Sequence, residues 1–234
     1  MLSSFTVKLL SILPEELTLK LVKKKVNGYI KKYANLKVEG LEELKNEEGP
    51  FIFVCNHLSN SDGLVLDHIL KERYDPIFVA GVKLSKDPIT NFGIKIVRNI
   101  LVKPNSADKE AISKMVKSVR NGDNILIFPE GTRSRTGAMI EGKKGIVLIA
   151  RMAKAKIVPI GMSGTDKLLP ISKSDDMGGE SWGYSDVTVK FGKPITLRKK
   201  LKEEDRHEFE DECLENIMKS IANLLPESYR GVYK

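Results

Sequence analysis

The chain has 234 residues, of which 41% are apolar and 30% are charged, so it can bury one sizeable core as a single domain with an appendage. Its two cysteines, Cys55 and Cys213, lie far apart with no secretory signal before them, which argues against a disulfide framework and favours a reduced, cytoplasmic setting. With so few cysteines and three histidines that show no ligand spacing, we expect no metal site.

The net charge of +8 is concentrated in two segments. Residues 1–33 hold seven lysines against two glutamates, a net charge of +5. Residues 130–156 hold seven basic side chains against two glutamates, again a net charge of +5. Two basic segments on a nearly neutral body predict two anionic partners, or one partner that is contacted twice.

The beginning of the chain has the pattern of an amphipathic helical pair. Apolar residues crowd one helical face over residues 2–13, and Pro14 then opens a second helix with apolar side chains at three- and four-residue spacing and lysines between them. No apolar run reaches the roughly 20 residues that a membrane-spanning helix needs. We expect residues 1–35 to dock on an anionic membrane and residues 36–234 to form an α/β domain. The alternative is a surface helix packed on the domain, with its lysines solvated.

Downstream, short apolar strands alternate with helical patterns. The expected strands cover residues 36–39, 51–55, 76–80, 94–98, 124–128, 157–160 and 187–191. The expected helices cover residues 63–70, 107–120, 143–153 and 203–225. This alternation predicts an α/β fold with a mixed, largely parallel sheet flanked by helices, whose ligands gather beyond the carboxyl ends of the strands.

Three further features follow from this order of elements. Pro159 indicates that the strand over residues 157–160 lies at an edge of the sheet. Residues 167–186 lack clear periodicity and are a candidate mobile flap. His57, Arg98 and Glu130 each stand near an expected strand exit, so all three are expected where ligands bind.

The stretch from Asn56 to Asp62 follows a buried strand and carries a candidate acid–base pair. Asp62 can hold one imidazole nitrogen of His57 as an N–H group, which leaves the other nitrogen free to take a proton. Taken alone, such a pair is more often a solvated contact or a helix cap, because Asp and Ser are favoured caps.

Residues 128–134 place an acid, a glycine, a hydroxyl and a cation directly after another buried strand. Gly131 lets a ligand approach the backbone closely, and Arg133 offers a planar fork that suits phosphate. Thr132 and Glu130 can hydrogen-bond hydroxyl groups of the same ligand. A strand-to-loop turn with exposed charges is the competing interpretation.

Other catalytic and nucleotide-binding signatures are broken. The string Gly-Met-Ser-Gly at residues 161–164 departs from the Gly-x-Ser-x-Gly pattern of serine hydrolases. Cys55 stands in an apolar strand, which favours a packed, inert thiol. Residues 137–144 are one residue short of a phosphate-binding loop and have Lys144 where Ser or Thr should bind magnesium.

Four stretches, in their order and spacing, resemble the four blocks of the glycerolipid acyltransferase family, and most of all its bacterial lysophosphatidate acyltransferases. They are the box of His57 and Asp62 preceded by Asn56, the Gly-x-x-x-x-Arg box from Gly93 to Arg98, the box from Phe128 through Pro129 to Arg133, and the pair Val158 and Pro159. The resemblance covers about residues 36–195.

The resemblance implies direct transfer of a fatty acyl group from a thioester to the 2-hydroxyl of lysophosphatidate, which gives phosphatidate. It implies that His57 takes the proton of the attacking hydroxyl and that Asp62 orients the imidazole. The other implied roles are phosphate binding by Arg98 and Arg133, positioning of the glycerol part by Glu130, Gly131 and Thr132, support of the histidine loop by Asn56, and contact of Val158 and Pro159 with the acyl chain.

The resemblance also implies that no cofactor is needed, since the acyl group arrives on acyl carrier protein or coenzyme A. It implies a peripheral, monotopic enzyme on the cytoplasmic face of the cell membrane. Its expected partners are an anionic membrane surface and a lysophospholipid, and nucleic acid is not among them.

The sequence departs from the family pattern near the surfaces that should contact substrate. Gly81 and Lys83 replace a usual lysine and glutamate, and Gly142 stands where a phenylalanine is common. The acceptor therefore stays open, with glycerol 3-phosphate or another lysolipid as the alternative. Outside the enzyme class, a basic module that binds anionic membranes or nucleic acid would account for the charge but not for the boxes.

Overall fold

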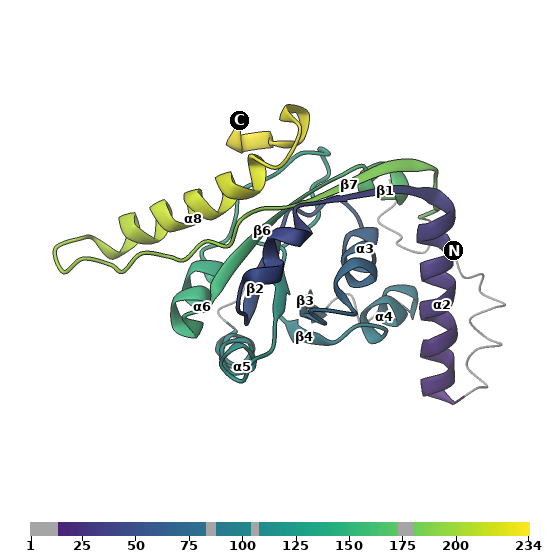
Figure 1. Ribbon diagram of the computed structural model, residues 1–234, viewed down its shortest axis with the longest axis horizontal. Coiled ribbons are helices and arrows are strands. Elements are labelled where there is room, and N and C mark those ends of the chain that lie inside the picture. Colours follow the sequence, from purple (N-terminus) through teal and green to yellow (C-terminus); the bar gives the residue numbers. More distant parts are fainter. Residues whose placement is uncertain (1–13, 83–87, 104–107, 173–179) are drawn as a thin grey trace.

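The computed structural model describes residues 14–82, 88–103, 108–172 and 180–234. In this part of the chain, a seven-stranded sheet lies between two layers of helices (Figure 1). The strands are β1 (Ala34–Glu39), β2 (Phe51–Cys55), β3 (Ile77–Gly81), β4 (Asn99–Val102), β5 (Ile125–Ile127), β6 (Lys156–Ser163) and β7 (Ser185–Phe191). The helices are α2 (Glu15–Tyr33), α3 (Ser61–Leu70), α4 (Pro88–Lys95), α5 (Lys109–Arg120), α6 (Gly145–Ala153), α7 (Thr165–Leu168) and α8 (Arg206–Ala222), with 3₁₀ turns η1 (Leu41–Asn46), η4 (Glu227–Tyr229) and η5 (Gly231–Tyr233).

The sheet has the order β1-β7-β6-β2-β5-β3-β4. Neighbouring strands pair in parallel except β6 and β7, which are antiparallel. The expected mixed, largely parallel α/β fold is confirmed. The carboxyl ends of β2 to β6 share one edge of the sheet, and the reversal at β7 brings the first residues of β7 and β1 to that same edge.

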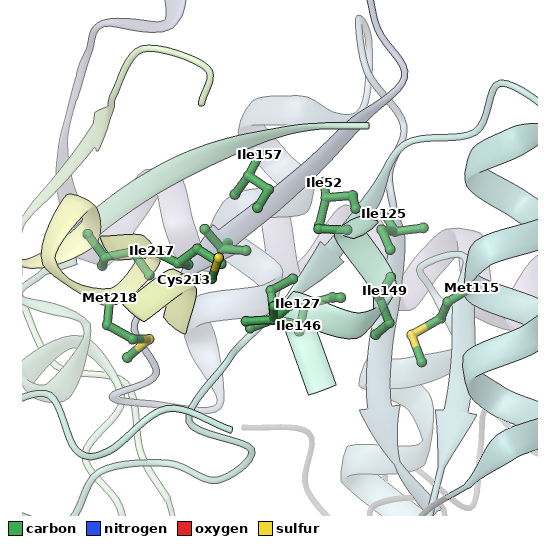
Figure 2. Packing of buried hydrophobic residues seen from close by; sticks show 14 of the residues in the cluster. Ile52, Met115, Ile125, Ile127, Ile146, Ile149, Ile157, Cys213, Ile217 and Met218 are labelled. Atoms are coloured by element: carbon green, nitrogen blue, oxygen red, sulfur yellow. The ribbon is translucent and has the colours of Figure 1, made fainter. Parts of the chain in front are cut away.

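Both faces of the sheet are buried, as a parallel sheet requires. Ile52 and Val54 of β2 face α5, α6 and α8, whereas Phe51, Phe53 and Cys55 face α2, α3 and α7. Figure 2 shows the first of these two cores, with Ile52, Ile125 and Ile127 of the sheet close to Ile146 and Ile149 of α6, Met115 of α5 and Ile217 of α8. The strict alternation along β2 fixes its register and so fixes where the loop after Cys55 begins.

The helix that Pro14 was expected to open is confirmed as α2, whereas the helix expected over residues 2–13 lies outside the described residues. One face of α2 packs on the domain through Thr18, Val22 and Ile30. The expected domain boundary after residue 35 falls inside β1, so α2 runs directly into an edge strand. Each helix of the described segments is too short or too polar to cross a bilayer.

The strand expected over residues 94–98 is wrong. Helix α4 continues through Lys95, and the side-chain amide of Asn99 donates to the carbonyls of Ile94 and Val97 at distances of 3.1 and 3.2 Å. This local cap ends the helical segment, and β4 begins at Asn99 itself. A short apolar run fits a helix end as well as a strand, and the capping amide decides between them.

The edge position expected from Pro159 is also wrong, because β6 lies between β7 and β2. The missing N–H of Pro159 points to the same side as its carbonyl oxygen, which accepts from Gly192 N–H at 2.8 Å. That contact lies beyond Ile160 and Phe191, the last pair of the β6–β7 ladder. The proline is tolerated because it stands at the end of this ladder, where its carbonyl is paired and its missing N–H interrupts no further pairing.

The remaining expected strands and helices are present, with ends shifted by no more than three residues. Within the expected flap over residues 167–186, α7 ends at Leu168 and β7 begins at Ser185, while residues 173–179 lie outside the described residues.

Candidate active site

The contact expected between His57 and Asp62 is present at the exit of the central strand β2. Asp62 lies in the first turn of α3, and its Oδ2 accepts from His57 Nδ1 at 2.7 Å, from Leu58 N–H at 2.6 Å and from Ser59 N–H at 2.9 Å. The side chain of Asp62 is 1% exposed and that of His57 is 19% exposed. Because Nδ1 faces a carboxylate, the neutral ring carries its proton there, and Nε2 is the nitrogen that can accept one.

The loop after β5 makes three further contacts with His57. The ring of Phe128 stacks on the imidazole, with 4.1 Å between centroids and 16° between planes. His57 N–H donates to Glu130 Oε1 at 2.8 Å, and the carbonyl of His57 accepts from Ser134 N–H at 2.7 Å. The sequence did not single out Phe128 as a neighbour of the imidazole, although the aromatic residue directly after a strand was a usable signal.

Glu130 is a buried brace between two loops. It has no exposed surface, and its second oxygen, Oε2, accepts from Ile140 N–H at 2.9 Å. The role expected for Glu130 as a partner of substrate hydroxyl groups is therefore not supported, since both oxygens are taken by the backbone. Burial, together with the smaller effect of the Asp62 charge, raises the pKa of Glu130 from 4.5 to about 7, against the opposing effect of these two amides.

The rest of the 128–134 loop divides into an exposed and a buried part. Gly131, at φ +70°, and Thr132 are exposed, so both are accessible to a ligand. Pro129 is buried, and its carbonyl accepts from Lys143 N–H at 2.9 Å. Arg133 is 17% exposed and donates from Nη1 to Glu180 Oε1 at 2.7 Å.

Glu180 is a residue of this site that sequence reasoning missed. It also accepts from the side-chain amide of Asn60 at 2.8 Å, and so it joins the loop of His57 to the loop of Arg133. It stands alone in a stretch without periodicity, and nothing in the pattern marked it.

Asn56 ties the histidine loop to β6. Its side-chain amide donates to the carbonyl of Met162 at 2.9 Å, and its oxygen accepts from Met162 N–H at 2.8 Å. The buried side chain thus pairs with β6 as a backbone peptide would, which is a physical basis for the expected support of His57.

Arg98 does not lie with the other predicted site residues. It precedes β4, and its guanidinium donates to the carbonyl of Asp75 at 3.0 Å and to the carboxylate of Asp123 at 2.6 Å. These two residues precede β3 and β5, so Arg98 lies at the amino edge of the sheet, a strand length or roughly 15 Å from the edge that carries His57. The cation that follows β4 at the carboxyl edge is Lys103. Because the strand was expected over residues 94–98, Arg98 was taken for the residue in that position.

The other predicted residues are part of the framework. Gly93 lies on α4. Val158 and Pro159 are buried in the middle of β6, in register with Phe53 and Val54, and they are not exposed at its end.

Cys55 is fully buried, and burial raises the pKa of its thiol well above the usual value, which agrees with an inert, packed cysteine. Over the described segments, no three His, Cys, Asp or Glu side chains gather as a metal site would require.

The raised pKa of Glu130 predicts a pH-dependent stability. Between pH 4.5 and about 7 the unfolded chain has released the Glu130 proton while the folded chain retains it, so this group makes folding less favourable as pH rises. The contribution is about 3 kcal/mol across the window. In urea unfolding of the wild type and Glu130→Gln, the wild type should lose about this much stability relative to the variant between pH 4.5 and pH 7.5. A difference between the two proteins that stays constant with pH would contradict the prediction.

Comparison with known proteins agrees with this geometry. The sequence profile of the acyltransferase family matches residues 35–163. A chloroplastic 1-acyl-sn-glycerol-3-phosphate acyltransferase of Brassica napus is 29% identical over 161 residues, which are 68% of this chain and 44% of that protein. A glycerol-3-phosphate acyltransferase of Xanthomonas axonopodis pv. citri is 29% identical over 200 residues, covering 70% of this chain and 22% of that protein. The chain thus spans less than half the length of these relatives.

The fold has a counterpart in a solved structure. The crystal structure of PlsC, the 1-acyl-sn-glycerophosphate (LPA) acyltransferase of Thermotoga maritima, superposes with a TM-score of 0.60 and 25% identity over 89% of this chain and 83% of that one. Since the family match spans more than half of the chain and contains both the His57–Asp62 pair and the loop that braces it, the protein belongs to the acyltransferase family and is a PlsC-like member of it.

Proposed function

We propose that this protein transfers a fatty acyl group from an acyl thioester to the 2-hydroxyl of lysophosphatidate and so forms phosphatidate. The observation that carries the proposal is the His57 imidazole, held through Nδ1 by a buried Asp62 at the exit of the central strand. The names of the Brassica and Thermotoga proteins, both acyltransferases of 1-acyl-glycerol phosphates, support this choice of acceptor.

In the proposed mechanism no acyl-enzyme forms. Nε2 of His57 takes the proton of the acceptor hydroxyl while the oxygen attacks the thioester carbonyl, and Asp62 stabilises the imidazolium. A carbon–oxygen bond forms, the carbon–sulfur bond breaks, and the proton passes from His57 to the departing thiolate. The products are the ester and the free thiol of acyl carrier protein or coenzyme A.

Arg133 is the proposed phosphate ligand, because its guanidinium lies on the loop that also braces His57 and is partly exposed there. Exposed Gly131 and Thr132 line the approach to it. Arg98 is left out of the proposed site, since it is paired with Asp123 at the other edge of the sheet.

We also propose that the enzyme acts at the cytoplasmic face of a membrane, with α2 on the lipid surface. Leu17, Lys20, Leu21, Lys24 and Lys31 recur at helical spacing on the side of α2 that is exposed. Leu17 and Leu21 keep 45% and 42% of their surface exposed. Apolar side chains between lysines suit the boundary between lipid headgroups and acyl chains.

Four aromatic rings gather beside the end of α2, next to the side that packs on the domain. Tyr29 contacts Tyr33 and Trp182, and Tyr33 contacts Tyr184, which is 75% exposed. Tyrosine and tryptophan are enriched at membrane interfaces.

A panel of acceptors tests the proposed function. With one acyl thioester, lysophosphatidate should be acylated at least about tenfold more efficiently, as kcat/KM, than glycerol 3-phosphate or neutral monoacylglycerol, because only it offers both a phosphate for Arg133 and an acyl chain. Preference for glycerol 3-phosphate would favour the second candidate, acylation of glycerol phosphate, which the Xanthomonas relative suggests. No turnover with any phosphate-bearing acceptor would refute both candidates.

Replacing His57 tests the enzyme class. His57→Ala should lower kcat by ~10²- to 10⁴-fold, the usual contribution of a general base, while vesicle binding is unchanged. His207→Ala, at an exposed position on α8, is the matched control and should keep full activity. Full activity of His57→Ala would refute its role as general base, and absence of turnover in the wild type together with normal vesicle binding would indicate a binding module.

The membrane surface is tested on the exposed side of α2, because deleting the whole helix would also remove Val22 and Ile30 from the core. Leu17→Glu/Leu21→Glu should reduce sedimentation with anionic vesicles by about tenfold or more, through lost apolar burial and added negative charge. The control, Leu201→Glu/Val232→Glu, adds the same two negative charges at exposed apolar residues outside α2. It should sediment with the vesicles as the wild type does. If both double variants bind alike, α2 is not the docking surface.

A further inference from the structure

Glu180 is an ionisable side chain of the site to which the proposed mechanism gives no role. It lies in the stretch between α7 and β7, far in sequence from the two loops of the site. Its side chain is 1% exposed, yet both of its oxygens are hydrogen-bonded, Oε1 to Arg133 Nη1 at 2.7 Å and Oε2 to Asn60 Nδ2 at 2.8 Å. Burying an unpaired carboxylate destabilises the folded state by several kcal/mol. The hydrogen bonds from Arg133 and Asn60 therefore compensate the burial of the Glu180 side chain.

The partners of Glu180 come from different parts of the site. Asn60 lies between His57 and Asp62, on the loop that presents the imidazole. Arg133 lies on the loop after β5. A single carboxylate therefore sets the separation between the imidazole loop and the guanidinium.

That separation matters to the reaction. An acceptor whose phosphate binds Arg133 must place its hydroxyl at Nε2 of His57, and a misplacement of about 1 Å can cost ~10²-fold in rate. The bond to Glu180 uses one of the five N–H donors of the guanidinium, so the others can still bind phosphate.

We propose that Glu180 is a positioning residue. It holds Arg133 at a fixed distance from His57, so that Arg133 can bind the phosphate of the acceptor while the acceptor hydroxyl lies at His57. This inference rests on the proposed function, in which the acceptor carries a phosphate. The opposite role is competition, in which Glu180 merely occupies Arg133 until the phosphate displaces it. The two roles depend on different properties of the side chain, its reach and its charge.

Two variants of the 234-residue chain separate the effect of side-chain length from the effect of charge. Glu180→Asp keeps the charge but is one methylene shorter and cannot reach both Arg133 and Asn60. Glu180→Gln keeps the reach, since its oxygen can accept from Arg133 and its NH₂ group can donate to Asn60 after the Asn60 amide turns over. Glu180→Asp keeps a negative charge beside Arg133, so we expect it to destabilise the folded protein less than Glu180→Gln.

Steady-state kinetics with lysophosphatidate and one acyl thioester give the readout. Positioning predicts that Glu180→Asp raises the acceptor KM about tenfold, that Glu180→Gln stays within about threefold of the wild type, and that both leave the donor KM unchanged. An acceptor KM that falls below the wild-type value in Glu180→Gln would show competition and overturn the proposal. Equal effects on the donor KM and the acceptor KM would show general damage to the structure and would overturn it as well.

A double variant shows whether Glu180 acts through Arg133. In an Arg133→Ala background, adding Glu180→Asp should change the acceptor KM by less than about twofold, because the group to be positioned is gone. If Arg133→Ala alone leaves the acceptor KM unchanged, the phosphate assignment of the proposed function fails. If Arg133→Ala raises it and Glu180→Asp does not, only the positioning role fails.

Discussion

The geometry of the site depends on one carboxylate oxygen, Asp62 Oδ2, which collects three N–H groups within a few residues of chain. Two of these groups are backbone amides, so the chain must turn tightly after β2 to reach them. The third is the imidazole, so the orientation of the ring follows from the turn. The other oxygen, Oδ1, is buried and finds no hydrogen-bond partner among the described residues, which leaves the compensation for burying this charge to Oδ2.

Side chains continue the hydrogen bonding of the sheet where the pairing of its strands ends. Beyond Cys55, the Asn56 amide pairs with the backbone of Met162 in both directions. Glu130 then accepts from the backbone of His57 and of Ile140. Buried backbone donors must be paired, and these two side chains pair them at the point where the strands can no longer do so. The loops beyond the strand ends thus present an imidazole without leaving these buried amides unsatisfied.

The sequence predicted the fold and the His57–Asp62 contact well because both rest on local patterns: apolar strands with clear ends, and two residues within one loop. It failed where a side-chain cap or a neighbour distant in sequence decides. Arg98 was misplaced because the apolar run before it belongs to a helix that Asn99 ends. Pro159 is tolerated in a central strand because the pairing of β6 with β7 ends beside it, at Ile160 and Phe191. Glu180 is about fifty residues from Arg133 along the chain, and only the folded structure brings the two together.

The segment that carries Glu180 also joins the site to α2, the helix proposed to dock on the membrane. Glu180 binds Arg133, Trp182 contacts Tyr29 of α2, and two residues later Tyr184 contacts Tyr33. Because β7 runs against β6, the end of α2 lies at the same edge of the sheet as His57, about three strand spacings or roughly 15 Å away. A helix lying in the headgroup layer would therefore hold the guanidinium and the imidazole near the lipid surface through one short stretch of chain. That arrangement suits an acceptor whose acyl chain stays in the membrane while its phosphate and hydroxyl reach the protein.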